Sequence, residues 1–392
     1  MADSAIIQAQ EFMRREGIDA WLLYDYRGMN PAMWAMLGRV DNVTRPCWFL
    51  VPARRAPQLL VHHVDAGRFA SLGISTATFA SRRQMLAWLR VLLRGKARVA
   101  MEYSPMGELP RASRVDAGTV ELVREAGDTQ VVSSADLHQF ATQRWSEPML
   151  ASHRSAAVKL SAVVIEAFTY IGARLASGPT EWEVAEFIRG RCRDLGLEMP
   201  EGPVVAANAH GSDPHYEPEE ATSWAIRRFD WVLIDLWARE HGDVGMFADI
   251  TWVGYVGREP PEQHRSVFRA VTGARDAALE HMERVLRAGR PLQGWQVDRV
   301  ARRHIAAQGY GRYFTHRLGH SLGREVHGEA ANLDSWETKD TRRLLTGIAV
   351  TIEPGVYMPA FGVRSEIDVY IGERGPEVTT TVQRDIVLIG ES

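Results

Sequence analysis

A stretch between residues 231 and 252 constrains the fold more than any other part of the sequence, because it places two acidic residues inside apolar segments. Apolar residues alternate on both sides of its centre, HGDVG, which is typical of a turn, so the pattern predicts a β-hairpin. Asp235 and Asp249 lie in the two predicted strands. A buried carboxylate is costly unless a cation or several hydrogen-bond donors compensate its charge. The pair therefore favours a hard metal ion between the strands.

The same pattern recurs nearer the C-terminus. The run IAVTIEPGVY contains Glu353 and the run GVRSEIDVYI contains Glu366, so we expect a second hairpin with one acidic residue in each apolar strand. His320, in LGHSLG, adds a nitrogen ligand. Together the two hairpins and this histidine predict an oxygen-rich metal site.

Four carboxylates in a dry pocket carry too much negative charge for one divalent ion, so we expect two cations. Bridging carboxylates hold such pairs about 3.5–4 Å apart. Oxygen-rich coordination favours Mn²⁺, Co²⁺ or Fe²⁺ over a thiolate-bound ion. A water between two such ions loses its proton near neutral pH, and the ions polarise a carbonyl, so the expected reaction is hydrolysis of an amide bond by a metal-bridging hydroxide.

Length and charge exclude several other classes of protein. At 392 residues the chain is long enough for two domains, and its net charge of −3 gives no reason to expect nucleic acid or an anionic membrane as a partner. Cys47 and Cys192 are too few for a disulfide framework and lack the spacing of a structural zinc site. The N-terminus does not resemble a signal peptide, and we find no run of about 18 apolar residues. We expect a soluble, cytoplasmic protein.

Helical and strand patterns alternate through the first part of the chain. Residues 4–17 and 82–94 have helical spacing, and DAWLLYDY, CWFLVP, PQLLVHHV and ARVAMEY have the composition of buried strands. This alternation predicts an α/β domain over residues 1–147. We interpret residues 27–45 as a packed surface loop; the alternative is a lip that reaches over an active site, that of a partner subunit included.

Residues 148–392 show a different order. A long helix from Pro148 is followed by a second helix with a capping box from Thr180 to Glu183, and then by the first acidic hairpin. Helices at about 261–288 and in GWQVDRVARRHIAAQG precede the second acidic hairpin. Helix, helix and hairpin, occurring twice, predict an α+β domain with an internal duplication around one shared site.

The segments LIDLW, FADIT, LGHSLGREVHG, TIEPGVY and GVRSEID resemble, in the same order, the metal motifs of the M24-type, pita-bread metallopeptidases. The first domain is similar to that of creatinase and prolidase relatives, so the resemblance covers nearly the whole chain. It implies a creatinase/prolidase-like domain at 1–147, a pita-bread catalytic domain with pseudo-twofold symmetry at 148–392, and a homodimer. The nearest relatives in this sense are Xaa-Pro dipeptidases (prolidases) and aminopeptidase P, which cleave the bond before proline.

The resemblance also implies a role for each acidic residue. Asp235 would bind one metal, His320 and Glu353 the other, and Asp249 and Glu366 would bridge the two, with Mn²⁺ or Co²⁺ as the expected ions. Glu353 would also move the proton from the bridging water to the leaving nitrogen.

Three further residues match positions that contact the substrate in this family. His215, in DPHYEP, would steady the substrate and its tetrahedral intermediate, and His327, in REVHG, would line the pocket. Arg364 would hold either Glu366 or the substrate carboxylate, and both alternatives remain open. His316 matches a histidine of some prolidases, and we expect it to pack beside the ligands without binding a metal.

The chain departs from the family pattern in its pocket residues. Asp235 and Asp249 stand 14 positions apart, further than is usual, and Trp237 and Trp252 replace the common glycine and arginine. We expect the longer turn to leave the faces of both aspartates unchanged.

Several functions remain open. An Xaa-Pro dipeptidase acting on short peptides is favoured over an aminopeptidase, because Trp237 and the insertion at 239–245 narrow the cleft. Arg364, Arg317 and Arg45 are candidates for the carboxylate of its substrate. A metal-free binding protein or a creatine-type amidinohydrolase would not retain all five ligands.

Overall fold

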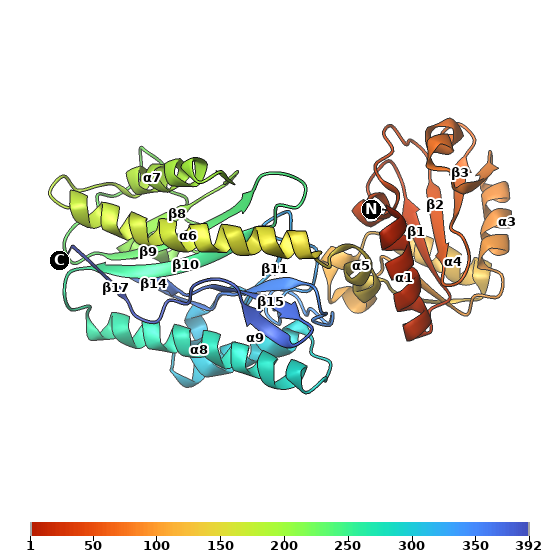
Figure 1. Cartoon of the computed structure of the whole chain (residues 1–392). Helices are drawn as coiled ribbons and strands as arrows, with labels where there is room; N and C mark the ends of the chain where they lie inside the picture. The colour runs from red at the N-terminus through yellow and green to blue at the C-terminus, as the bar shows by residue number, and fades with distance from the viewer. Residues whose placement is uncertain (1, 391–392) are drawn as a thin grey trace. The chain divides into compact units, whose positions relative to one another are not determined.

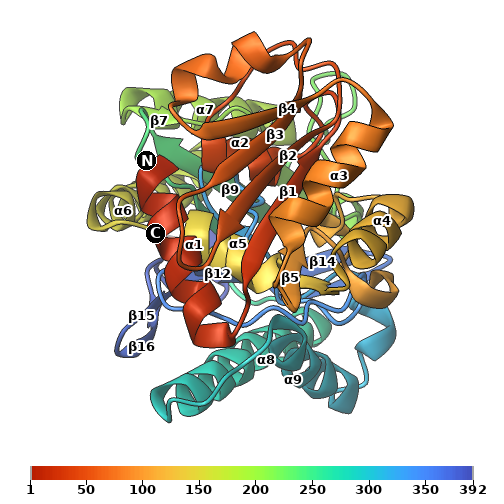
Figure 2. The ribbon, with the colours of Figure 1, turned by 90° about the vertical axis from the view of Figure 1, so that its right-hand side faces the viewer.

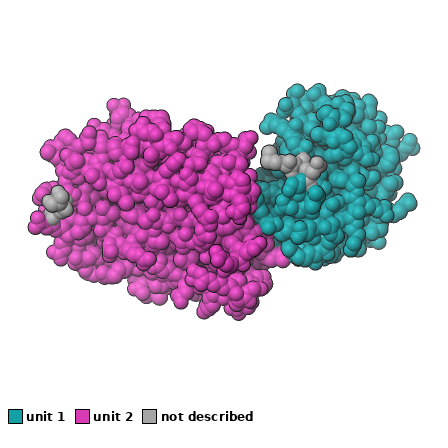
Figure 3. Space-filling model, in the orientation of Figure 1, with its two compact units in different colours: residues 1–144 teal, residues 145–392 magenta. Residues whose placement is uncertain are grey.

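The computed structural model describes residues 2–390 and divides the chain into two compact units, residues 1–144 and 145–392 (Figure 3). The boundary predicted at 147 and 148 falls at the start of helix α6 (Glu147–Arg174), which opens the second unit. An α/β unit followed by an α+β unit is the fold class that the sequence predicts.

The first unit contains a mixed sheet. Its strands are β1 (Ala20–Asp25), β2 (Cys47–Pro52), β3 (Gln58–His62), β4 (Ser75–Phe79), β5 (Arg98–Met101) and β6 (Gln130–Ser133). They lie in the order β4-β3-β2-β1-β5-β6, with β1 antiparallel to β2 and parallel to β5. The longer helices of this unit are α1 (Ala2–Glu16), α3 (Arg82–Leu93), α4 (Ala117–Gly127) and α5 (Ala135–Thr142).

Part of the segment interpreted as a loop is a helix. Helix α2 (Pro31–Leu37) begins after Asn30, whose side chain accepts a hydrogen bond from the N–H of Ala32, with Pro31 at its first position. Asparagine followed by proline is a local signal for a helix start. The loop interpretation was therefore wrong for this part. The helix was missed because its buried methionines do not form a recognisable helical face in so short an element.

Two hairpins dominate the second unit. The strands of its first sheet are β7 (Leu197–Glu198), β8 (Val204–Ala207), β9 (Trp231–Glu240), β10 (Ala248–Val256) and β17 (Val387–Ile389). The remaining strands are β11 (Ser321–Leu322), β12 (Ala349–Ile352), β13 (Gly355–Met358), β14 (Phe361–Arg364), β15 (Ile367–Gly372) and β16 (Gly375–Val378). In pairs, β9 lies antiparallel to β10, β12 to β15, and β13 to β14.

Helices cover both sides of these strands. The helices are α6, α7 (Glu181–Asp194), α8 (Glu262–Arg287) and α9 (Gly294–Ala307). Short 3-10 turns span Asn208–Ser212 and Gly311–Tyr313 in this unit, and Ala66–Leu72, Pro105–Gly107 and Pro110–Ala112 in the first unit. Figure 1 shows α6 and α7 on one side of β9 and β10, and α8 and α9 on the other. Both views place α8 beside α9 (Figure 1 and Figure 2).

Alternation along β9 and β10 assigns each side chain to one of these two layers. Ile234 and Ile250 belong to the apolar cluster with α6 and α7, whereas Leu233 and Val253 belong to the cluster with α8 and α9. Successive side chains of a strand point to opposite faces, so odd-numbered residues of this hairpin face the α8 and α9 layer. Asp235 and Asp249 therefore lie between the two layers, toward the second hairpin.

Helix α6 is long and apolar enough, by length and composition, to cross a membrane, with a mean hydropathy of 1.5 over its most apolar window. Half of that window is buried, and α6 packs on β9 and β10. From the sequence we expected no run of about 18 apolar residues, and Lys159 and Glu166 do interrupt the apolar residues of α6. Its buried face makes it the core helix of the second unit.

Candidate metal centre

The first hairpin directs its two aspartates to the same face. Asp235 lies opposite Thr251, and Asp249 lies opposite Trp237, in the antiparallel pairing of β9 and β10. Residues directly opposite each other in such a pair point to the same side of the sheet. The faces of both acids are as expected; of the inserted residues 239–245, Arg239 and Glu240 extend β9 and pair with β7, and the others form the turn.

The second hairpin differs from the expectation, because Glu353 and Glu366 lie at breaks between strands. β12 ends at Ile352 and β13 begins at Gly355, while β14 ends at Arg364 and β15 begins at Ile367. Because β12 pairs with β15 and β13 with β14, both breaks lie at the same level of one long hairpin. The prediction of one acid inside each strand was wrong in this respect.

A change of hydrogen-bond partner accounts for the breaks. Pro354 has no N–H to donate to a neighbouring strand, and the N–H of Glu366 donates to the carbonyl of Thr251 at 3.2 Å. The second hairpin thus leaves its own ladder to bond the first hairpin. This switch brings the two acidic pairs together.

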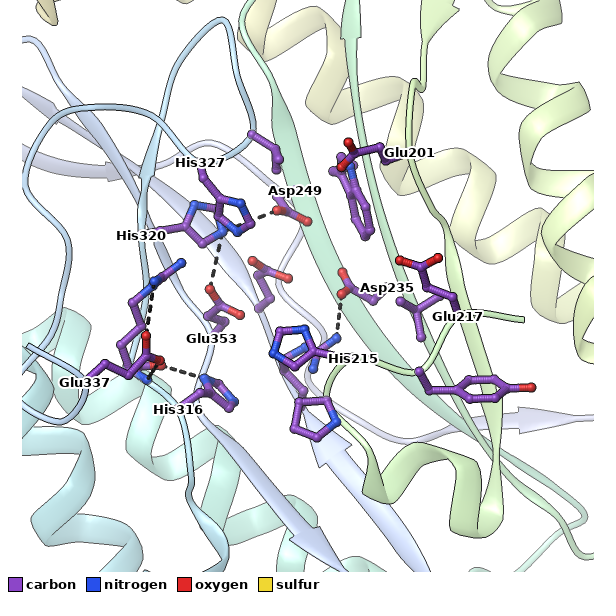
Figure 4. Close-up of a pocket in the computed structure, with 18 residues that line it drawn as sticks. Glu201, His215, Glu217, Asp235, Asp249, His316, His320, His327, Glu337 and Glu353 are labelled. Atoms are coloured by element: carbon purple, nitrogen blue, oxygen red, sulfur yellow. Dashed lines mark hydrogen bonds and ion pairs between the residues drawn. The ribbon is translucent and has the colours of Figure 1, made fainter. Parts of the chain in front are cut away.

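His320 completes the cluster from the segment before β11. The N–H of Thr351 donates to the carbonyl of His320 at 2.8 Å, and the N–H of His320 donates to Oγ1 of Thr351 at 2.9 Å. His320 Nε2 lies 3.4 Å from Oε1 of Glu353 and 3.6 Å from Oδ2 of Asp249 (Figure 4). Ligand atoms of Asp249, His320 and Glu366 all lie within 4.8 Å of one another.

Several carboxylate oxygens of the cluster have no hydrogen-bond donor among the described residues. Asp249 and Glu366 are 4% and 2% exposed. One oxygen each of Asp235, Asp249 and Glu366 has no hydrogen-bond partner among the described residues. Orphaned, buried carboxylate oxygens are costly in a folded protein unless a cation binds them. With an imidazole beside them, these groups fit one or more divalent cations.

Burial and mutual repulsion change the acidity of the cluster. Burial raises the pKa of Glu353 to about 7. Burial, and then the charges of Asp235 and Asp368, raise the pKa of Asp249 well above its usual value. The pKa of Glu366 is raised in the same way, first by burial and then by Asp249. Without a cation, the cluster therefore holds protons that ordinary carboxylates have lost.

Arg364 binds the first hairpin directly. Its guanidinium donates to Oδ2 of Asp235 at 2.5 Å, to Oγ1 of Thr251 at 3.1 Å and to Oη of Tyr357 at 2.8 Å. It reaches Glu366 only through Thr251, whose hydroxyl donates to that glutamate at 2.7 Å. Neither alternative left open by the sequence includes the contact with Asp235. Arg364 is 4% exposed and belongs to the framework of the cluster.

His316 lies beside this framework. Its Nε2 lies 2.7 Å from the hydroxyl of Tyr357, and its Nδ1 lies 2.6 Å from the carbonyl of Arg317. Burial, and then the charge of Arg364, lower the pKa of His316 to about 3, so its ring is neutral. The ring nitrogens of His316 lie against Tyr357 and Arg317, whereas His320 contacts the acidic cluster.

The two other predicted histidines line the pocket above the cluster. His215 and His327 are both exposed, and the ring of His327 lies 4.4 Å from that of His320 in an edge-to-face arrangement. Figure 4 shows His327 next to His320, while His215 approaches from the side of Asp235. The pocket has a volume of about 260 Å³. It is lined by Glu201, Val204, Pro214, His215, Tyr216, Glu217, Asp235, Trp237, Asp249, His316, Arg317, His320, Val326, His327, Glu337, Glu353, Arg364 and Glu366.

Sequence reasoning missed the hydroxyl groups that position the acids. Thr251 lies two residues after Asp249, and Thr351 lies two residues before Glu353, to which its hydroxyl donates at 3.1 Å. A separation of two places side chains on the same face of a strand, so this signal was present in the sequence for Thr251, whereas Glu353 lies just beyond the end of β12. Tyr357 had no comparable signal, because its partners Arg364 and His316 are brought to it by the fold.

Comparisons with known proteins agree with this arrangement. Residues 152–373 match the family model described as Metallopeptidase family M24. An uncharacterized peptidase of Staphylococcus haemolyticus is 35% identical over 208 residues, which are 53% of this chain and 54% of that protein. The chain therefore spans about half the length of the curated relatives that it matches.

Two solved structures share the fold over nearly the whole chain. A prolidase from Pyrococcus horikoshii OT3 aligns with a TM-score of 0.60 and 24% identity, covering 98% of this chain and 99% of that one. A dipeptidase from Mycobacterium ulcerans aligns with a TM-score of 0.69 and 20% identity, covering 99% and 98%. At these identities the alignments show a common architecture.

The raised carboxylate pKa values predict how the metal-free protein responds to pH. An acid whose folded pKa is raised stabilises the fold below its unfolded pKa of about 4, and this contribution is lost as pH rises through the folded pKa. For Glu353 that folded pKa is about 7. The melting temperature of chelated protein should therefore fall by several degrees between pH 5 and pH 8, measured by calorimetry. Saturating Mn²⁺ should remove most of the fall; a metal-free protein equally stable at both pH values would contradict the prediction.

Replacing Asp249 by asparagine should weaken metal binding. The change removes one charge from the centre of the cluster and preserves the volume of the side chain. We expect Asp249→Asn to lose at least one ion per chain, measured by elemental analysis after dialysis. Asp243→Asn is the matched control, because Asp243 lies in the exposed turn of the same hairpin. Equal metal content in the two variants would exclude Asp249 as a ligand.

Proposed function

Because this chain belongs to Metallopeptidase family M24, we propose that it hydrolyses the peptide bond before proline in short peptides, with Xaa-Pro dipeptides as its best substrates. One observation carries the proposal: acidic residues from two distant hairpins and a histidine meet in one pocket, where one oxygen each of Asp235, Asp249 and Glu366 has no partner among the described residues. The structures that share this fold include proteins described as a prolidase and a dipeptidase, which supports the choice of substrate.

We assign the ligands as the sequence suggests. Asp235 would bind one cation, His320 and Glu353 the other, and Asp249 and Glu366 would bind both, with Mn²⁺ or Co²⁺ as the ions. Bound there, divalent cations supply a polarised substrate carbonyl and a water of lowered pKa. The contacts of Arg364 and Thr251 with Asp235 and Glu366 support this assignment, because partners behind a ligand fix its orientation.

Glu353 is suited to move the proton. Its side chain is 15% exposed, against 6% for Asp249, so it borders the space that a substrate would fill. The hydroxyl of Thr351 holds one of its carboxylate oxygens. Glu353 would take the proton of the attacking water and deliver it to the nitrogen of proline as the amide bond breaks.

The histidines and an arginine would hold the substrate. His215 and His327 approach the pocket from two sides and would donate hydrogen bonds to the oxygen of the scissile carbonyl as charge develops there. Arg364 is already engaged by Asp235, so we assign the dipeptide carboxylate to Arg317. Arg317 lines the pocket, and its guanidinium lies 3.4 Å from Glu337, a contact loose enough to be exchanged.

An aminopeptidase that accepts longer peptides is the alternative. The pocket volume of about 260 Å³ lies just below the usual range of about 300–1,000 Å³ for ligand sites, and Trp237 forms part of its wall, which favours a dipeptide. The cytoplasmic location and the homodimer remain predictions from the sequence.

Rates on two peptides test the proposed specificity. With both cations bound, we expect Ala-Pro to be hydrolysed at least roughly tenfold faster than Ala-Pro-Ala, because the tripeptide places its carboxylate beyond Arg317. Product formation by chromatography measures both rates. Comparable rates would favour the aminopeptidase, and a metal-loaded protein that hydrolyses neither peptide would refute the proposed function.

Replacing His327 should separate binding of metal from catalysis. We expect His327→Ala to keep its metal content and to lose about 100-fold in kcat/KM on Ala-Pro, the usual effect of removing one donor to a developing oxyanion. His63→Ala is the control, since His63 is exposed in the first unit. Loss of metal from the His327 variant, or an unchanged kcat/KM, would show that the assigned role is wrong.

A further inference from the structure

A buried glutamate outside the metal cluster holds one wall of the pocket. Glu181, at the first position of α7, is fully buried. Its carboxylate accepts hydrogen bonds from the N–H of Ala207 at 2.6 Å, the N–H of Trp224 at 2.7 Å and the hydroxyl of Tyr216 at 2.7 Å, and it lies 2.9 Å from Nδ1 of His210. These groups belong to the end of β8 and to the segment 208–225, which we call the strap.

The strap forms the wall of the pocket that faces the cluster. Four of its residues in a row line the pocket: Pro214, His215, Tyr216 and Glu217. Figure 4 shows His215 and Glu217 on the side of Asp235. Glu181 therefore contacts Tyr216, the neighbour of the proposed catalytic His215, although the carboxylate of Glu181 does not line the pocket.

Other bonds hold the two ends of the strap, from Asn208 to Asp230 and from Ser212 to the carbonyl of Met358, whereas its middle is held mainly by local turns and by Glu181. The sequence of the strap, NAHGSDPHYEPEEATSWA, is polar and contains no apolar run that could pack as a core. Inside it, the ring of His210 stacks between the rings of Tyr216 and Trp224, with centroid distances of 4.3 and 3.8 Å. Glu181 bonds all three of these residues, so it ties the middle of the strap to both of its ends.

The helix itself does not need the carboxylate of Glu181. Thr180 and Glu183 form the capping box that satisfies the start of α7. A buried carboxylate with several donors is strongly hydrogen bonded, and neutralising it leaves some of those donors mismatched. Burial, and then the bond to Glu181, raise the pKa of Tyr216, so its hydroxyl remains a donor.

We propose that Glu181 is a positioning residue for the substrate: it fixes the strap so that His215 and its neighbours meet the bound peptide. This inference rests on the proposed function, because it takes the peptide to bind in this pocket. Glu181 acts through the strap and touches neither the substrate nor the cations.

Protease sensitivity tests the positioning without reference to activity. Glu217, Glu219 and Glu220 are exposed in the strap, so a glutamate-specific protease reports on its order. In the metal-loaded full chain, we expect Glu181→Gln to be cleaved at these sites roughly tenfold faster than the unaltered protein. Glu183→Gln is the matched control on the same helical turn, because glutamine also completes a capping box. Equal cleavage of the two variants would overturn the proposal.

A double-mutant cycle tests whether Glu181 acts through His215. We expect Glu181→Gln to lower kcat/KM on Ala-Pro about tenfold with metal content unchanged, and to have a much smaller effect when His215→Ala is already present. Independent, multiplying effects would indicate a merely structural role and overturn the proposal. An unaltered protein that hydrolyses no peptide would refute the proposed function, whereas the cleavage rates would still decide the role of Glu181.

A milder variant covers the case in which Glu181→Gln does not fold. Tyr216→Phe keeps the ring stacked on His210 and removes the bond to Glu181. We expect a smaller, severalfold increase in cleavage at the same glutamates. An unchanged cleavage rate in this variant would contradict the proposal.

Discussion

Repulsion among buried carboxylates is the constraint on which the second unit depends. Asp235 and Asp249 come from one hairpin, Glu353 and Glu366 from another, and the chain between them forms two long helices. Their charges are offset within the protein chiefly by Arg364, with the hydroxyls of two threonines adding hydrogen bonds. Cations bound to such a cluster would stabilise the fold, so we expect metal binding and folding to be coupled in this unit. The repulsion that destabilises this centre comes from the same groups that would make it reactive.

Much of the site could be predicted because a strand has a period of two. The faces of Asp235 and Asp249 follow from the alternation of apolar residues in β9 and β10, whatever the length of the turn between them. The positions of Glu353 and Glu366 could not be read in the same way. Their strands are interrupted where the second hairpin bonds the first, and such a bond between residues over a hundred positions apart leaves no local pattern.

The remaining differences between the expected and the observed structure are of two kinds. Some sequence signals were present but were given too little weight, and some contacts have no local signal in the sequence. Asn30 and Pro31 are a local signal for the start of helix α2, to which the loop interpretation gave too little weight. The bond from Arg364 to Asp235 and the bonds that hold the strap to Glu181 depend on how the layers pack. A sequence pattern identifies which groups can react more readily than which groups hold them in position.

The apolar character of α6 has a consequence for the synthesis of the protein. The helix precedes its partner strands β9 and β10 in the chain, so a nascent polypeptide exposes this apolar segment before the strands that cover it are synthesised. Because α6 is synthesised before these strands, its apolar face stays uncovered until they follow, and folding of the second unit depends on the order of synthesis as well as on the final packing.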